Sequence, residues 1–140
     1  MSGPPDFFAV YSLVHRPLIN QVNEILYRHK LSSSYWRVLR ILEKSARSNF
    51  GDITDALYVE KPALTKIVKK LVELGYVIVE RGVDKREKVI ALTELGRAQI
   101  TKIRSELNPF LEGALDGLTA EQLENAIDVL HVIRKNITNK

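Results

Sequence analysis

The sequence predicts a mainly helical (α+β) fold in which four helices precede one β-hairpin and two helices follow it. Two observations carry this prediction. Apolar residues recur at three- and four-residue steps through most of the chain, as on the buried face of a helix. Between residues 76 and 92, two short apolar runs flank a charged turn that contains a glycine, which is the pattern of a hairpin.

Composition excludes several classes of protein. The 140 residues suffice for one domain with a core and are too few for two ordinary domains. A net charge of +4 permits nucleic-acid binding, so the distribution of charge must decide. The absence of cysteine excludes disulfides, thiolate metal sites and cysteine catalysis. The sequence has neither a membrane-spanning apolar run nor the pattern of a signal peptide, so we expect a cytoplasmic protein that does not bind a membrane.

The first two helices are predicted from their apolar spacing. The first spans about residues 5 to 29, and Pro17 should bend or break it because proline lacks the backbone donor. The serine run Ser32 to Ser34 supplies several possible caps for the second helix. That helix fades near Ala46, and its apolar residues are Trp36, Leu39, Ile41 and Leu42.

The next two helices form a compact pair. Asn49 to Asp52 opens a short third helix, expected to bury Ile53, Ala56 and Leu57. The fourth helix spans about Pro62 to Leu74, and Gly75 ends it as a left-handed cap. Its apolar face comprises Leu64, Ile67, Val68, Leu71 and Leu74.

The hairpin and the last two helices complete the order. Residues 76–80 and 87–92 read as strands joined by residues 81–86. A helix starts at Thr93, with a kink expected at Pro109, and Thr119 with Gln122 has capping-box spacing for the last helix. The terminal helices carry more apolar surface than this core can cover. We therefore expect burial against a second subunit, and a long monomeric bundle is the alternative.

Positive charge gathers on the fourth helix and on the hairpin tip. No acidic residue occurs between Lys61 and Val72, and the exposed face of the helix carries Lys61, Lys66, Lys69 and Lys70. The tip adds Arg81, Lys85, Arg86 and Lys88, and Asp84 can hold the Arg86 guanidinium through a charge-assisted bond. A solvated surface helix is the alternative reading. The helix–turn–helix order and the cationic hairpin instead favour a winged helix that grips duplex DNA.

These residues carry a resemblance to a known family. The chain resembles the multiple-antibiotic-resistance regulator (MarR) family of winged helix–turn–helix transcription factors. The resemblance implies a DNA-binding lobe over residues 31–92 and dimerisation helices over residues 5–29 and 93–138, within one domain of residues 1–140. The matching features are Leu31 with Trp36, Val38 and Leu39, then Ile53 to Leu57, Lys61 to Leu71, Leu74-Gly75-Tyr76-Val77, Asp84-Lys85-Arg86 and Leu92-Thr93-Glu94-Leu95-Gly96.

The resemblance also implies roles for individual residues. Lys69 and Lys70 would contact phosphate, and Asp84 would orient Arg86 in a minor groove, with Lys85 and Lys88 beside it. The bases would face Lys61, Pro62, Ala63, Thr65 and Lys66. Many members have hydroxyl residues where this chain has Pro62 and Ala63, so readout there rests on apolar contacts with thymine methyls and on Thr65 and Lys66. The tip is about one residue shorter than is common in the family.

A second, weaker site follows from the same resemblance. Relatives often bind small anionic aromatic compounds, and such an effector would suit Tyr11, His15, Arg16, Tyr35 and Arg37, although packing alone also accounts for these residues. The three histidines, His15, His29 and His131, lack metal-ligand spacing. We expect no cofactor, no metal and no catalysis.

The sequence therefore predicts a homodimeric repressor that binds an inverted repeat in double-stranded DNA and is released by a small effector. The alternative from another class is a protein-interaction module whose winged helix binds a partner protein and whose lysines only keep it in solution. Salt-dependent binding to duplex DNA distinguishes the two.

Overall fold

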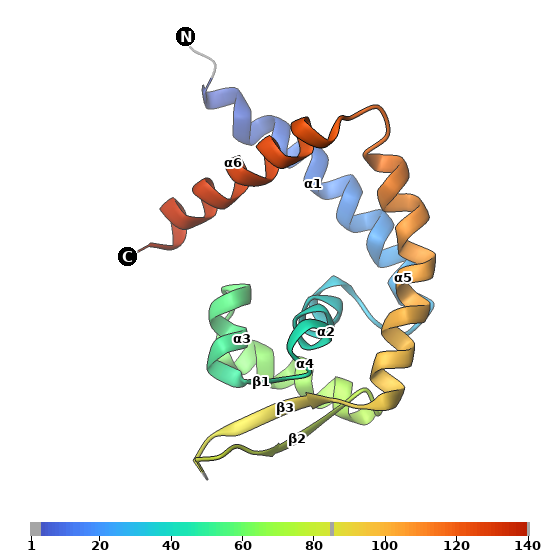
Figure 1. The fold of residues 1–140 in the computed structure, drawn as a ribbon, viewed down its shortest axis with the longest axis vertical. Helices are drawn as coiled ribbons and strands as arrows, with labels where there is room; N and C mark the ends of the chain where they lie inside the picture. The colour runs from blue at the N-terminus through green and yellow to red at the C-terminus, as the bar shows by residue number, and fades with distance from the viewer. Residues whose placement is uncertain (1–3, 85, 140) are drawn as a thin grey trace. The chain divides into compact units, whose positions relative to one another are not determined.

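The computed structural model describes residues 4–84 and 86–139 (Figure 1). These residues form six helices and three strands. The order is α1 (Pro4–Tyr27), α2 (Ser33–Ser45), β1 (Arg47–Asn49), α3 (Phe50–Leu57), α4 (Lys61–Glu73), β2 (Val77–Arg81), β3 (Lys88–Leu92), α5 (Glu94–Ala114) and α6 (Ala120–Thr138). The mainly helical fold is confirmed, with one strand that the sequence did not predict.

The chain divides into two compact units, Met1–Leu107 and Asn108–Lys140. The first unit contains α1 to α4, the sheet and most of α5. The second contains the end of α5 and all of α6.

The core of the first unit is aliphatic. The predicted face of α4 is confirmed, because Leu64, Val68 and Leu71 are buried. Ile53 is buried as expected, whereas Ala56 is exposed and Leu57 is half-buried. Ala56 and Leu57 lie on the same side of the helix as Ile53, but one turn further on, at the end of this eight-residue helix and next to the exposed Tyr58. The other fully covered side chains include Leu26, Leu39, Leu42, Ile90, Ile100 and Ile103.

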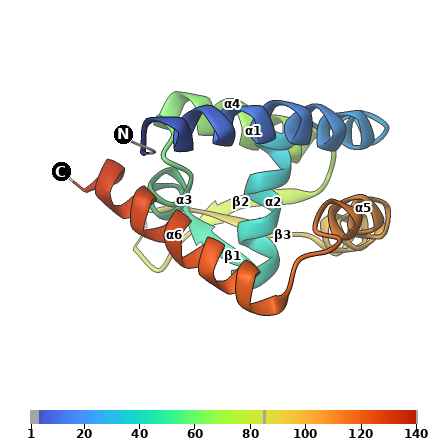
Figure 2. The same cartoon turned by 90° about the horizontal axis from the view of Figure 1, so that it is seen from above.

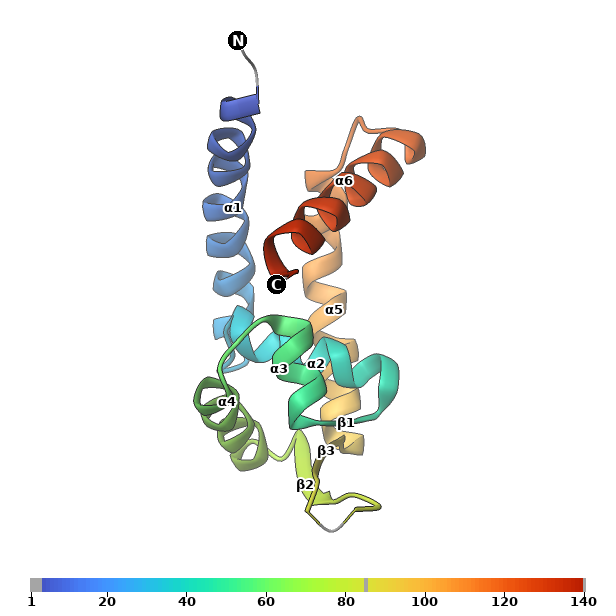
Figure 3. The ribbon, with the colours of Figure 1, turned by 90° about the vertical axis from the view of Figure 1, so that its left-hand side faces the viewer.

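The sheet has the strand order β1–β3–β2, with β3 in the centre and both pairings antiparallel. The predicted hairpin is confirmed and runs from the pair Val77–Leu92 to the pair Arg81–Lys88. Helix α2 packs against β3, and α4 packs against β2 (Figure 2). The hairpin extends beyond the helices of this unit (Figure 3).

Strand β1 was missed because its own residues are polar and number only three. Arg47, Ser48 and Asn49 become a strand by pairing with Ala91, Ile90 and Val89, which lie about forty residues further along the chain. The carbonyl of Ala46 extends the ladder by accepting from the N–H of Leu92 at 2.9 Å.

The prolines do not end their helices. Pro17 lies inside α1 and Pro109 lies inside α5, and each helix continues through its proline. Pro17 was expected to bend or break its helix, and the structure shows that it does not break it. A proline removes one donor from the ladder, and the remaining turns of helices 24 and 21 residues long keep the helical path.

Side-chain caps fix several helix starts. The capping box of Thr119 and Gln122 is confirmed. Asn49 caps α3, because its Oδ1 accepts from the N–H of Asp52 at 2.7 Å. Ser32 occupies the N-cap position of α2 without a side-chain bond, contrary to expectation. Asn23 of α1 takes that role, and its Oδ1 accepts from the N–H of Ser33 at 2.7 Å.

The contacts of Thr93 and Gly96 explain why the Leu-Thr-x-x-Gly segment, residues 92–96, has these residues. Thr93 Oγ1 donates to the carbonyl of Gly75 at 2.7 Å and accepts from the N–H of Gly96 at 2.9 Å. The Thr93 N–H bonds the carbonyl of Tyr76 at 3.1 Å. A Cβ on Gly96 would lie 2.1 Å from that same Tyr76 oxygen, so only glycine fits. Burial also raises the pKa of the Tyr76 hydroxyl. These contacts bind the end of α4 and both strands to α5.

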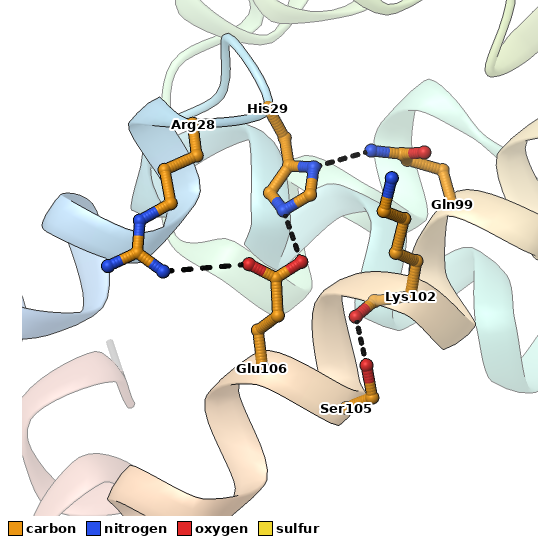
Figure 4. A network of polar contacts seen from close by, with 6 residues as sticks. All are labelled: Arg28, His29, Gln99, Lys102, Ser105 and Glu106. Carbon is orange, nitrogen blue, oxygen red and sulfur yellow. Dashed lines mark hydrogen bonds and ion pairs between the residues drawn. The ribbon is translucent and has the colours of Figure 1, made fainter.

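A polar network joins the end of α1 to α5 (Figure 4). His29 Nε2 lies 2.8 Å from Glu106 Oε2, and His29 Nδ1 lies 2.8 Å from Gln99 Nε2. Arg28 Nη1 approaches the other Glu106 oxygen at 3.7 Å. His29 is thus a structural residue at the junction of α1 and α5.

A second network joins α2 to α5. Arg104 Nε donates to both carboxylate oxygens of Glu43 at 3.0 Å, and its Nη2 bonds the same carboxylate. The guanidinium also lies over Trp36, 5.5 Å from the ring centroid. The hydrogen bond from Arg104 is the main reason that the pKa of Glu43 is lowered, although partial burial opposes it. The same bond raises the pKa of Arg104.

Candidate nucleic-acid interface

Helix α4 presents a cationic outer face. Pro62 lies in its first turn, where a missing donor is harmless. Lys61, Lys66 and Lys69 are exposed, Lys70 is half-buried, and Pro62, Ala63 and Thr65 are exposed among them. The Thr65 hydroxyl donates to the carbonyl of Lys61 at 3.0 Å, so it lies along the helix. This face is fixed in place by the buried leucines on the opposite side.

The turn between α3 and α4 is closed by its backbone. Tyr58 adopts the left-handed conformation, with a φ of 55°, and caps α3 by donating to the carbonyl of Thr54. Arg37 of α2 reaches the same turn, where its Nη2 donates to the carbonyl of Leu57 at 3.1 Å. The two helices therefore form a helix–turn–helix with α4 as the second helix.

The hairpin tip is held by three short bonds. The N–H of Gly82 bonds the carbonyl of Glu87 at 2.9 Å, and the N–H of Glu87 bonds the carbonyl of Asp84 at 2.8 Å. Asp84 Oδ1 accepts from the backbone N–H of Arg86 at 3.0 Å. Val83 is fully exposed at the tip.

The expected partner of Asp84 needs correction. Asp84 bonds the backbone of Arg86, and the ion pairs among residues 4–84 and 86–139 do not include its guanidinium. An aspartate bonding the N–H two residues ahead forms a local turn, which the two-residue spacing permits without any ion pair. Asp84 thus shapes the turn and leaves the Arg86 side chain exposed. Lys85, also expected in this interface, lies outside the described residues.

The start of α4 and the hairpin tip share one hollow of about 350 Å³. Lys61 and Thr65 come from α4, and Arg86 and Lys88 come from the hairpin. Three cations facing one opening favour an anion such as phosphate. The remaining lining residues are Asn49, Phe50, Gly51 and Glu87, which the sequence did not assign to the site. Asn49 was predicted only as part of a helix start, and no local signal indicated that α3 begins beside the hairpin.

A further cation stands beside this hollow. Arg81 and Lys88 are directly opposite each other in the β2–β3 ladder, so their side chains leave the sheet on the same face. Arg81 belongs to the predicted cationic tip, and the register now places it next to Lys88.

The residues of the second predicted site are only partly brought together. Tyr11 and His15 stack on each other on α1, with ring centroids 5.7 Å apart. Arg16 is exposed one residue further on, and Tyr35 is half-buried on α2. Arg37 is engaged with the helix–turn–helix turn. The effector site remains a prediction.

The described residues add two negative findings. Residues 4–84 and 86–139 contain no cluster of three or more histidine, cysteine, aspartate or glutamate side chains able to hold a metal ion. Over the same part of the chain, none of the helices is both long and apolar enough to cross a membrane.

Known proteins match this chain in sequence and in fold. A sequence model of the MarR family matches residues 29–87. The HTH-type transcriptional regulator YwoH of Bacillus subtilis is 33% identical over 124 residues, which cover 81% of this chain and 90% of YwoH. The homoprotocatechuate degradative operon repressor of Escherichia coli is 27% identical over 107 residues, or 76% of this chain and 72% of the repressor.

Solved structures share the fold. The crystal structure of NadR in complex with 4-hydroxyphenylacetate superposes with a TM-score of 0.83 and 22% identity, covering 96% of each chain. Together with the sequence matches, this establishes the protein as a member of the MarR family, a DNA-binding transcriptional regulator and not an enzyme.

Proposed function

We propose that the protein is a homodimeric repressor that binds an inverted repeat in duplex DNA. Helix α4 of each protomer enters a major groove, and each hairpin reaches the neighbouring minor groove. The observation that carries this proposal is the hollow lined by Lys61 and Thr65 of α4 together with Arg86 and Lys88 of the hairpin. One phosphate strand passing through it would contact both elements at once.

Individual residues take distinct roles in this complex. Lys69 and Lys70 lie further along α4 and contact phosphates, which hold the helix in register without reading sequence. Arg86 enters the minor groove, and Asp84, Lys85 and Lys88 flank it. Base edges are read by Lys61, Pro62, Ala63, Thr65 and Lys66. The apolar pair Pro62 and Ala63 suits thymine methyl groups.

Dimer formation is supported by the exposed apolar side chains of the terminal helices, α6 and α1. Helix α6 has a complete capping box and an amphipathic sequence, yet among its described residues no side chain is buried. The first half of α1 likewise exposes Phe8, Val10, Leu13 and Val14. Helices with uncovered apolar faces are stable in water when a partner covers them. We propose residues 5–29 and 93–138 as dimerisation helices around a DNA-binding lobe of residues 31–92.

Repression and its relief by an effector are proposed from relatives. The E. coli relative is named as an operon repressor, and NadR was crystallised with 4-hydroxyphenylacetate. A small aromatic anion would suit the stacked Tyr11 and His15 with Arg16 nearby on α1, and Tyr35 and Arg37 complete the proposed set. Titrating the purified protein–operator complex with 4-hydroxyphenylacetate, and repeating the titration with the Arg16→Ala variant, tests this part separately.

The salt dependence of binding tests the main proposal. Affinity for a random duplex should fall steeply as salt rises, because each phosphate neutralised releases condensed counterions. Genomic fragments retained by the protein should then contain an inverted repeat whose half-site centres lie about 34 Å apart. A protein that retains no duplex even at low salt is not a DNA-binding repressor.

A further inference from the structure

Two residues line both of the hollows beside the hairpin tip. The first hollow is the one shared by α4 and the hairpin tip. The second, also about 350 Å³, is lined by Arg47 and Ser48 of β1, by Val89 of β3, and by Gly82 and Val83 of the hairpin turn. Asn49 and Glu87 line both hollows. They therefore lie where the two hollows adjoin.

Asn49 connects three elements. It is the last residue of β1, where it pairs with Val89 of β3. Its Oδ1 caps α3 by accepting from the N–H of Asp52 at 2.7 Å. Its Nδ2 remains available and donates to Oε1 of Glu87 at 3.4 Å. Because the cap fixes one end of the amide, the direction of the Nδ2 group is fixed as well.

Glu87 is similarly fixed in the hairpin. Its backbone N–H and carbonyl close the turn through Asp84 and Gly82. Its side chain lies over Gly82, where an added Cβ would be 3.3 Å from Glu87 Oε1 and 3.1 Å from a methyl of Val89. The bond from Asn49 thus joins an amide held at the start of α3 to a carboxylate that lies over the hairpin turn.

We propose that the Asn49–Glu87 bond positions the hairpin relative to the start of α3, so that Arg86 and Lys88 face the same phosphates as Lys61. The hairpin extends beyond the helices of its unit (Figure 3), and it is attached through its pairing with β1 and its packing against α4. The Asn49–Glu87 bond is charge-assisted and supplies a further point of attachment close to the tip. This inference rests on the proposed DNA-binding mode and assigns positioning roles to two residues that the mode does not use.

The competing explanation is simple electrostatics. A carboxylate in a cationic hollow repels phosphate, so removing its charge should tighten DNA binding wherever Glu87 points. Glu87→Gln and Glu87→Ala remove the same charge, but only glutamine keeps an oxygen that can accept from Asn49. Because both variants lose the same charge, the ratio of their affinities for DNA reports only the hydrogen bond from Asn49.

We expect the Ala variant to bind operator roughly fivefold more weakly than the Gln variant. This is the effect expected for the loss of one hydrogen bond between neutral groups. The ratio should fall toward one in an Arg86→Ala background, because a hairpin that has lost its groove contact gains nothing from being positioned. Glu73, an exposed residue at the end of α4, is the matched control. Its Gln and Ala variants should bind alike.

Substitution of Asn49, alone and together with Glu87, tests the same bond. Asn49→Asp keeps the cap, since aspartate caps as well as asparagine, but sets two carboxylates against each other. Adding Glu87→Gln restores a donor and acceptor pair at the net charge of the natural chain, and should recover operator affinity to within about twofold.

The outcomes separate the two levels of the proposal. Equal affinity of the two Glu87 variants, an unchanged ratio in the Arg86→Ala background, or a double variant as weak as Asn49→Asp would each overturn the positioning role. Loss of all duplex binding by the natural chain at low salt would instead remove the proposed function.

Discussion

Gly96 offers the sharpest test of how the hairpin is joined to α5. In Gly96→Ala the new Cβ would lie 2.1 Å from the carbonyl oxygen of Tyr76 and 2.9 Å from a methyl of Leu92. An ordinary contact is above 3.4 Å, so the backbone of Tyr76 must move by more than an ångström. That movement disturbs the bonds of Thr93 to Gly75, to Tyr76 and to Gly96.

The magnitude follows from these contacts. Three hydrogen bonds at about 1 kcal/mol each, plus about 1 kcal/mol of residual strain, oppose about 1 kcal/mol of gain from alanine in a helix. We expect the free energy of unfolding to fall by about 3 kcal/mol. Urea denaturation followed by circular dichroism measures it, at one fixed protein concentration because a dimer's stability depends on concentration.

Gly113 is the matched control on the same helix. No described atom, apart from its chain neighbours and the helix's own backbone, lies within 4 Å of a Cβ built there. Gly113→Ala should therefore stabilise the protein by roughly 0.5–1 kcal/mol through helix propensity alone. If Gly96→Ala unfolds at the same urea concentration as the natural chain, the close approach of Tyr76 is not as described and the reasoning fails.

Three further predictions concern DNA binding and pH. Arg86→Ala should weaken operator binding and leave the dimer intact by analytical ultracentrifugation, since Arg86 lies in the hairpin tip; unchanged affinity would refute its groove role. Lys69→Ala should weaken binding to all sequences alike and reduce the slope of log affinity against log salt by about one, measured by fluorescence anisotropy. The Glu43 carboxyl has a lowered pKa because Arg104 donates to it, so its contribution to stability is complete above its ordinary pKa of 4.5 and is lost as pH falls through the lower folded-state pKa. Glu43→Gln should therefore cost about 1 kcal/mol or less at pH 7, the pair being partly exposed, and should make the acid-induced loss of stability smaller; an unchanged acid titration would contradict this.

The sequence patterns were sufficient to predict the elements that depend on interactions between residues close together in the sequence. The face of α4, the hairpin and the capping box at Thr119 all depend on residues within a few positions of each other, and the structure confirms them. Strand β1 depends on partners in β3, so the polar run Arg47 to Asn49 carried no strand signal of its own. The cap of α2 likewise comes from Asn23, on another helix.

The same distinction decides which residues of the candidate site could be predicted from the sequence. The cations of α4 and the hairpin could be predicted because they follow one another in a short segment of sequence. Asn49 and Glu87 could not, because their contact requires α3 to begin beside the hairpin, which only the pairing of β1 brings about. The partner of Asp84 was misassigned for a smaller reason, since a two-residue spacing serves a backbone bond as well as an ion pair.

The full exposure of Val83 makes the hairpin tip accessible to chemical labelling. The chain has no cysteine, so Val83→Cys would create a unique thiol at the end of the hairpin. An environment-sensitive fluorophore attached there would report the tip's passage from water into a DNA groove in real time. The rate at which the hairpin engages could then be measured apart from the rate at which α4 docks.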